Sequence, residues 1–267
     1  MNNNLAISQI RHIVFTSGWT RDDDQFKRLD LSCARSLTVF GKRSSCFISP
    51  SMKLLRVLDL EDTEGMVEHH DLDHIGEFRH LKYLGLRNTG IAHLPKSLGK
   101  LHGLEELDIR GTYIAKLPPT FIHLTSLRHL HGGTMAACIS QQEFDDSEMT
   151  RHCPGLLKNA VSSDFCMCLL SLCQRHKPYG VRVPDKIGEL KSLLKMGTID
   201  AAGSRTVMEV QKLTQLRKLG VMGITKLNSK HLCSTLEHIH HLRSLMVHSD
   251  DSADYTLLPH LHTALKH

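Results

Sequence analysis

The sequence predicts an α/β repeat solenoid, with short parallel strands on one face and helical or irregular turns on the other. Two observations lead to this fold class. An apolar pattern, L-x-x-L-x-L, recurs at intervals close to 23 residues, and a proline keeps the same place between several of its copies. With 40% apolar and 23% charged residues, the 267-residue chain has the composition of a folded protein.

The apolar pattern can be followed along most of the chain. Three copies, each 23 residues after the previous one, contain Leu81, Leu84 and Leu86, then Leu104, Leu107 and Ile109, then Leu127 and Leu130, with Gly132 in the last place. Further copies begin at Ile10, Ala34, Leu55, Leu193, Leu216 and Leu242. The copy at Leu193 is expected to bury Met196 and Thr198. A fixed period of this length is typical of a repeat architecture.

The prolines confirm the frame independently. Pro95, Pro118 and Pro184 are separated by 23 and 66 residues, and apolar residues three positions apart follow each of them. Alternation at period two predicts a strand, whereas proline followed by apolar residues three apart predicts a helical or 3₁₀ turn. The pattern is that of a leucine-rich repeat, whose stacked units form a horseshoe with the strands on its concave face.

The repeat pattern divides the chain into three parts. We expect N-terminal repeats over 1–131, an interruption over 132–180, and C-terminal repeats over 181–267. The interruption is either an irregular insertion or a set of degenerate repeats, and it contains five of the eight cysteines. Its spacing C-x-C-x₄-C-x₂-H, from Cys166 to His176, is not a usual zinc pattern, so buried free thiols or a disordered insertion are expected rather than a metal site.

Residues that alternate with the buried leucines should point out of the concave face. This row changes from unit to unit while the leucines do not, and its charge is mixed in the middle of the chain and basic later. We therefore expect a protein partner to bind there. The candidate residues are Asp59, Tyr83, Arg87, Glu106, Asp108, Arg110, His129, Lys195, Lys218 and Met246.

Other classes of function find no support in the sequence. It contains no phosphate-binding G-x-x-x-x-G-K-[ST], no G-x-S-x-G and no H-E-x-x-H, so we expect neither catalysis nor a cofactor. The segment EHHDLDH, from Glu68 to His74, is read as a solvated loop on the convex side, and no metal site is predicted there. Basic residues are dispersed among acidic ones, which argues against nucleic-acid binding.

The compartment follows from what the chain lacks. The apolar run Phe165–Cys173 is far shorter than the roughly 20 residues of a membrane-spanning helix. Polar residues interrupt the N-terminal stretch where a secretory signal would be apolar, and the cysteines form no disulfide framework. We expect a cytoplasmic protein, which could still associate with membranes through its partners.

Several phrases resemble one family in particular. RSLTVFG from Arg35, LLRVLDLEDT from Leu54, HLKYLGLRNTGIAHLPKSLGKLHGLEELDIRGTYIAKLP from His80, GVRVPDKIGELKSL from Gly180 and LTQLRKLGVMGI from Leu213 are similar to the repeat region of plant nucleotide-binding leucine-rich-repeat disease resistance proteins, especially the cereal coiled-coil subgroup. The resemblance implies repeats that restrain a nucleotide-dependent switch and help to recognise pathogen effectors. The switch motifs themselves are missing from this sequence, so nucleotide binding is not carried over.

Two functions of different classes are compatible with these features. The first is a non-catalytic recognition and regulatory module of plant immunity, a truncated or partial disease resistance protein. Its partner would be a pathogen effector, a guarded host protein or the nucleotide-binding domain of a receptor. The second is a general intracellular leucine-rich-repeat signalling scaffold without an immune role.

Overall fold

The computed structural model describes residues 10–16, 30–40, 48–63, 72–133 and 180–249. The described stretches on either side of residues 134–179 belong to one structural unit. The histidine-rich loop before Leu72 and the cysteine-rich segment therefore lie mostly outside the described residues. Their sequence-based interpretations stay predictions.

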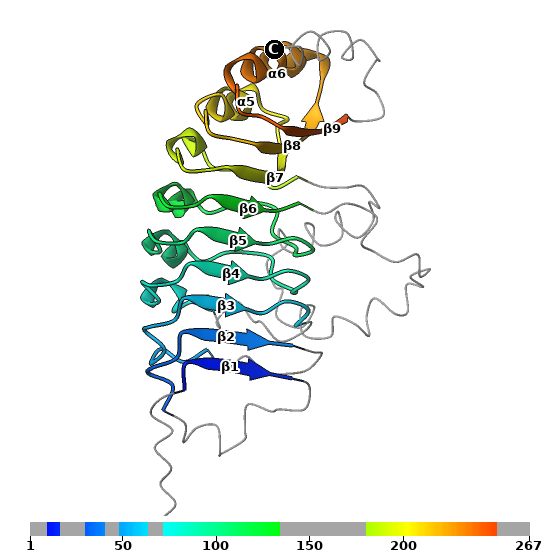
Figure 1. The fold of residues 1–267 in the computed structure, drawn as a ribbon. Coiled ribbons are helices and arrows are strands. Elements are labelled where there is room, and N and C mark those ends of the chain that lie inside the picture. The colour runs from blue at the N-terminus through cyan, green and yellow to red at the C-terminus, as the bar shows by residue number, and fades with distance from the viewer. Residues whose placement is uncertain (1–9, 17–29, 41–47, 64–71, 134–179, 250–267) are drawn as a thin grey trace, which may run out of the picture. The chain divides into compact units, whose positions relative to one another are not determined.

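A parallel sheet of nine strands runs through the described part of the chain, and its strands follow one another in sequence order (Figure 1). The strands are β1 (His12–Phe15), β2 (Ser36–Val39), β3 (Val57–Asp59), β4 (Tyr83–Gly85), β5 (Glu106–Asp108), β6 (His129–His131), β7 (Lys195–Asp200), β8 (Lys218–Ile224) and β9 (Ser244–Ser249). All nine coincide with copies of the leucine pattern. The predicted fold class, a leucine-rich repeat solenoid with short parallel strands, is confirmed.

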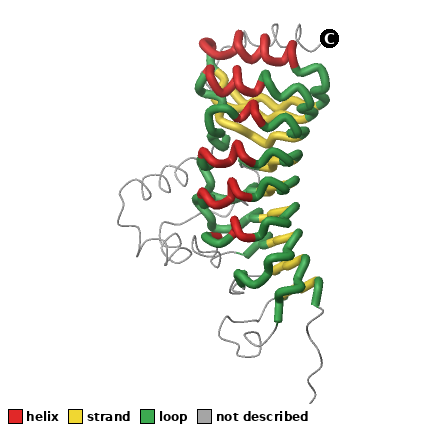
Figure 2. The backbone as a smooth tube through the Cα atoms, turned by 90° about the vertical axis from the view of Figure 1, so that its left-hand side faces the viewer, coloured by secondary structure: helices red, strands yellow, loops and turns green. Residues whose placement is uncertain are grey.

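From β3 onward, the described helices lie on the side of the repeats opposite the strands (Figure 2). They are the 3₁₀ helices η2 (Ile75–Glu77), η3 (Lys96–Lys100), η4 (Pro119–His123) and η6 (Ile187–Glu189), followed by the α-helices α5 (Ser204–Val210) and α6 (Lys226–His238). Pro95 and Pro118 directly precede η3 and η4, with φ of −69° and −66°. Proline fixes φ near this value and has no N–H that would need a partner in the first turn. The prolines that recur in the repeat therefore mark where these helices begin.

The leucines of the repeat form one continuous core. Leu58, Leu84, Leu107 and Leu130 are partners in register across β3 to β6, and none is more than 2% exposed. Their side chains alternate with outward residues because successive side chains of a strand point to opposite faces. Each unit is closed by its neighbours, so its stability depends on stacking.

A second repeated feature lies just beyond β3, β4 and β5. Thr63, Thr89 and Thr112 are 2% exposed, and each hydroxyl donates a 2.7 Å hydrogen bond to the carbonyl oxygen three residues earlier. The residue before each threonine has a positive φ, between 54° and 67°. This ladder of threonines satisfies buried backbone carbonyls at the turn, and the leucine count did not predict it.

Strand β7 corrects one sequence assignment. Met196 pairs with Leu219 as expected, but a β-bulge follows and Thr198 pairs with the outward Gly220. Ile199, which is 1% exposed, pairs with Val221 and takes the inward place predicted for Thr198, although Thr198 is itself buried at 8% exposure. A bulge adds one residue and reverses the faces beyond it, an effect that strict alternation cannot reveal.

The described strands form one sheet on both sides of the predicted interruption. β6 pairs directly with β7, although 63 residues separate the end of one strand from the start of the other. Gly132 accepts a hydrogen bond from the N–H of Thr198, and Val181 donates its N–H to the carbonyl of the same threonine. The chain before and after residues 134–179 thus bonds to the same residue of β7. The choice between an insertion and degenerate repeats concerns residues outside the described ones and stays a prediction.

Val181 also supplies the apolar group that the pattern lacks at Gly132. The methyl Cγ2 of Val181 lies 3.3 Å from where a Cβ on Gly132 would stand, and Val181 is 2% exposed. A residue 49 positions away therefore fills the vacancy in the leucine column. Within the described residues, no helix has the length and apolar character needed to cross a bilayer.

Candidate functional site

The ten predicted residues lie along the outward side of the sheet or just beyond its strands. We call the outward positions of β3 to β9 and the residues that follow β3, β4 and β5 the sheet face. Tyr83, Glu106, His129, Lys195 and Lys218 occupy one row, partnered in register from β4 to β8. The next row contains Asp59, Asp108 and, further along, Met246. Arg87 and Arg110 follow β4 and β5.

Asp108 and Arg110 form the most buried charged pair of the sheet face. The Asp108 side chain is 6% exposed, and Arg110 Nε donates to its Oδ1 and Oδ2 at 2.9 and 3.1 Å. The N–H of Arg110 donates to Oδ1 as well. These charge-assisted bonds raise the pKa of Arg110 and hold its guanidinium, which is about half exposed, in one orientation.

Tyr83 lies across Gly85 among carboxylates. A Cβ at Gly85 would stand 2.5 Å from Asp59 Oδ1 and 2.9 Å from the Tyr83 hydroxyl, so only glycine leaves room for both side chains. Burial, together with the charges of Asp59, Asp108 and Glu106, raises the pKa of Tyr83 to about 12. Burial likewise raises the pKa of Asp59. The phenol is therefore neutral at pH 7.

Arg87 is tied to the neighbouring repeat. Its Nη1 lies 2.9 Å from Oε1 of Glu61, and the two side chains are 42% and 28% exposed. This pair is partly solvated, and pairs of this kind contribute little to stability. The pair instead fixes the orientation of the Arg87 side chain. Arg87 and Arg110 thereby present two exposed guanidinium groups from successive repeats.

A carboxylate and two imidazoles meet on β5 and β6. Glu106 Oε2 lies 3.4 Å from His129 Nδ1, and Oε1 lies 3.2 Å from His131 Nε2. The two imidazole rings are arranged edge to face, with centroids 6.2 Å apart. Burial lowers the pKa of His131. The three side chains are between 25% and 36% exposed, so the cluster is accessible from solvent.

The remaining predicted residues extend the face toward β9. Lys195 and Lys218 are neighbours in register on β7 and β8 and both are exposed. Met246, on β9, is partly exposed beside Gly220. The structure thus separates the ten residues into an ionic group on β3 to β6 and a more open, basic group on β7 to β9.

Glu61, Gly85 and His131 are not among the ten residues predicted from the sequence. Each completes a contact of a residue that was predicted, namely Arg87, Tyr83 and Glu106. The cross-strand register provides the signal, because Gly85 is the neighbour of both Asp59 and Asp108, and His131 is the neighbour of Asp108.

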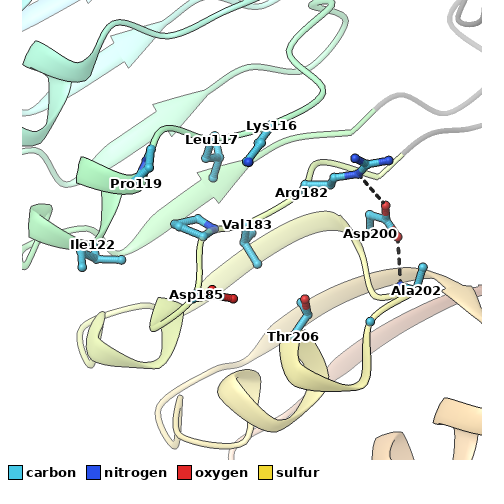
Figure 3. Close-up of a pocket in the computed structure, with 12 residues that line it drawn as sticks. Lys116, Leu117, Pro119, Ile122, Arg182, Val183, Asp185, Asp200, Ala202 and Thr206 are labelled. Carbon is cyan, nitrogen blue, oxygen red and sulfur yellow. Dashed lines mark hydrogen bonds and ion pairs between the residues drawn. The ribbon is translucent and has the colours of Figure 1, made fainter. Parts of the chain in front are cut away.

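A pocket of about 540 Å³ lies away from these residues (Figure 3). Its lining combines apolar residues such as Leu117, Ile122 and Val183 with polar groups. Asp200 accepts bonds from Arg182 Nε at 3.3 Å and from the N–H of Ala202 at 2.9 Å. The charged groups that line the pocket are thus partly paired with each other. None of the ten predicted residues lines the pocket.

Comparison with known proteins agrees with the repeat assignment. A family model described as a leucine-rich repeat region matches residues 33–141. Disease resistance protein Pik-2 of Oryza sativa subsp. japonica is 30% identical over 258 residues, which cover 92% of this chain and 24% of that protein. Disease resistance protein RGA4 of the same organism is 43% identical over 79 residues, 29% of this chain and 8% of RGA4.

The chain therefore spans about a quarter (24%) of the length of the first curated relatives it matches. Among solved structures, the leucine-rich repeat domain of the type III effector XopL is 19% identical and aligns with a TM-score of 0.46, covering 91% of this chain and 71% of that one. The sheet, the repeat frame and the sequence matches together identify the chain as a leucine-rich repeat region similar to that of rice disease resistance proteins.

Proposed function

We propose that this chain is a non-catalytic protein-recognition and regulatory module of plant immunity, acting as part of a disease resistance protein. The similarity to Pik-2 over 92% of the chain supports the immune setting. The observation that carries the proposal is the sheet face, where Tyr83 is surrounded by fixed charges of both signs.

The sheet face has the features of a protein-binding surface. Arginine and tyrosine are the side chains that most often dominate protein interfaces. Here Arg87 is held by Glu61 of the neighbouring repeat and Arg110 by Asp108 of its own repeat, so little side-chain freedom remains to be lost on binding. A standard interface covers roughly 800 Å² per partner, which requires contacts across several repeats.

The charge pattern suggests how a partner is oriented. Acidic groups and arginines gather on β3 to β6, whereas Lys195 and Lys218 are exposed on β7 and β8. A partner with acidic groups opposite the lysines and a mixed surface opposite Tyr83 would bind in one register. We propose an intracellular protein as this partner: a pathogen effector, a guarded host protein or the nucleotide-binding domain of a receptor.

Binding to a receptor domain supplied in trans tests the proposal. The nucleotide-binding domain of a related disease resistance protein is immobilised, and the affinity of the purified chain is measured by biolayer interferometry. We expect Tyr83→Ala to weaken binding by at least about 2 kcal/mol, the size of an interface hot spot. Arg87→Glu should weaken it about tenfold or more, since it reverses a charge on the face.

A charge reversal on the other side of the repeat is the matched control. Arg205 lies on α5 with its side chain 76% exposed, and Arg205→Glu should leave the affinity unchanged. Equal losses for Arg87→Glu and Arg205→Glu would show that the sheet face is not the binding surface. If the wild-type chain binds no receptor domain, effector or guarded protein, the general scaffold function replaces this proposal.

The size of the endogenous protein tests whether the chain acts within a larger receptor. An antibody against the segment from Asp200 to Lys218 should detect a band several-fold larger than the 30.1 kDa chain in source tissue. A band of about that mass would instead indicate a free repeat module that acts on its partners in trans.

A further inference from the structure

Three side chains of the sheet face offer their ligand atoms to a common point. Each of Glu106, His129 and His131 contributes one such atom, and these atoms all lie within 4.8 Å of one another. Strand geometry explains the convergence. His129 and His131 are two residues apart on β6 and share a face, and Glu106 is the direct partner of His129 on β5.

The donor set matches a borderline transition metal. Zn²⁺ is bound by imidazole nitrogen and carboxylate oxygen at about 2.0–2.2 Å, and two histidines with one glutamate form a known three-ligand set with an open fourth position. Ligands of a tetrahedral ion at these bond lengths lie roughly 3.3 Å apart. Glu106 Oε2 lies 3.4 Å from His129 Nδ1 and Glu106 Oε1 lies 3.2 Å from His131 Nε2, both close to this value. One ligand atom from each of the three residues lies within 4.8 Å of the other two, so a small movement of the side chains brings them to an ion.

The neighbouring cationic groups leave room for a metal ion. The nearest guanidinium, that of Arg110, is engaged by Asp108, so its charge is compensated within the face. Lys195 is the neighbour of His129 in register, but its exposed ammonium group can turn toward water.

We propose that Glu106, His129 and His131 form a mononuclear Zn²⁺ site on the sheet face, with its fourth position open to solvent. The ion replaces the two contacts of Glu106 with the imidazoles and links β5 to β6. The open position accepts water, or a carboxylate or imidazole of a bound molecule. The site goes beyond the proposed recognition function, and either one can fail without the other.

Calorimetric titration of the purified chain with ZnCl₂ tests the site. The chain has 20 histidines and eight cysteines, so the informative quantity is the difference between variants and not the total number of ions bound. The double variant H129N/H131N should bind one Zn²⁺ fewer than the wild type. Glu106→Gln, which is nearly isosteric, should weaken the same site by at least about tenfold, a loss that even an outer-shell change can bring.

A second pair of histidines is the matched control. His240 and His241 are both exposed in the turn between α6 and β9, and H240N/H241N should keep the wild-type stoichiometry. Circular dichroism verifies that each variant is folded. The same number of ions and the same affinity in the wild type, H129N/H131N and Glu106→Gln would overturn the site.

Discussion

At the scale of single residues, the fold changes the chemistry of Tyr83 by burying it among carboxylates. Gly85 leaves the space that the phenol covers, and the two neighbouring strands, β3 and β5, bring carboxylates toward it. A phenolate in this position would be both poorly solvated and repelled. Both effects favour the neutral form, and they raise the pKa of Tyr83 to about 12.

This shift makes Tyr83 a spectroscopic probe of the sheet face. The chain has four tyrosines, and an unperturbed tyrosine is half ionised at about pH 10. The difference in phenolate absorbance between wild type and Tyr83→Phe should be almost zero at that pH and should rise only as the pH nears about 12. A difference that develops at the ordinary pKa would contradict the described packing.

The sign of the associated stability change follows from linkage. The folded state holds the Tyr83 proton more tightly than the unfolded chain, so this contribution is complete below about pH 10 and is lost as the pH rises toward about 12. Unfolding in urea should therefore show that the wild type loses more stability than Tyr83→Phe across this window.

At the scale of elements, the bulge of β7 depends on one close backbone approach. A Cβ on Gly197 would stand 2.6 Å from the carbonyl oxygen of Gly132, the residue just after β6. Backbone atoms cannot rotate away as a side chain can. The bulge, the inward turn of Ile199 and the pairing of β6 with β7 therefore require glycine at this position.

Substitution of Gly197 tests that requirement. We expect Gly197→Ala to lower the free energy of unfolding by about 1–3 kcal/mol, the usual cost of overpacking, as measured by urea denaturation. Gly90 is the control, because no heavy atom lies within 4 Å of its Cβ position. Gly90→Ala should change stability by no more than about 1 kcal/mol, and a loss as large as that of Gly197→Ala would refute the steric argument.

At the scale of the whole molecule, the repeats before and after residues 134–179 form one sheet. Gly132 and Val181 bond to the same residue of β7, and Val181 completes the core column. In a solenoid each repeat is stabilised mainly by its neighbours, so the contact between β6 and β7 couples the two halves. Loss of the contact between β6 and β7 should uncouple the two halves, whereas removal of residues 134–179 should not.

A deletion and a point substitution distinguish these two outcomes. Replacing residues 134–179 by about six glycine and serine residues should preserve a single unfolding transition in calorimetry, because the flanking backbone segments are adjacent. Val181→Ala should cost about 2 kcal/mol, since it removes two buried methyl groups from the column. Two separated unfolding transitions in the deletion variant would show that residues 134–179 are needed to couple the two halves.

The sequence by itself determined the repeat, the position of all nine strands and the start of the proline-led helices. These follow from local periodicity and from the fixed φ of proline, which are properties of neighbouring residues. The sequence also determined that three site residues lie in one row, namely Tyr83, Glu106 and His129. This placement needs only the repeat frame and the alternation of side chains along a strand.

Only the tertiary structure decided the features that depend on residues far apart in the chain. Val181 fills the place left by Gly132, the bulge at Gly197 exchanges Thr198 for Ile199, and His131 joins Glu106 and His129. Each of these depends on the distance and register between separate strands, which a one-dimensional pattern does not contain. Packing, with its limit on how closely backbones approach, fixes that register and thereby the chemistry of the sheet face.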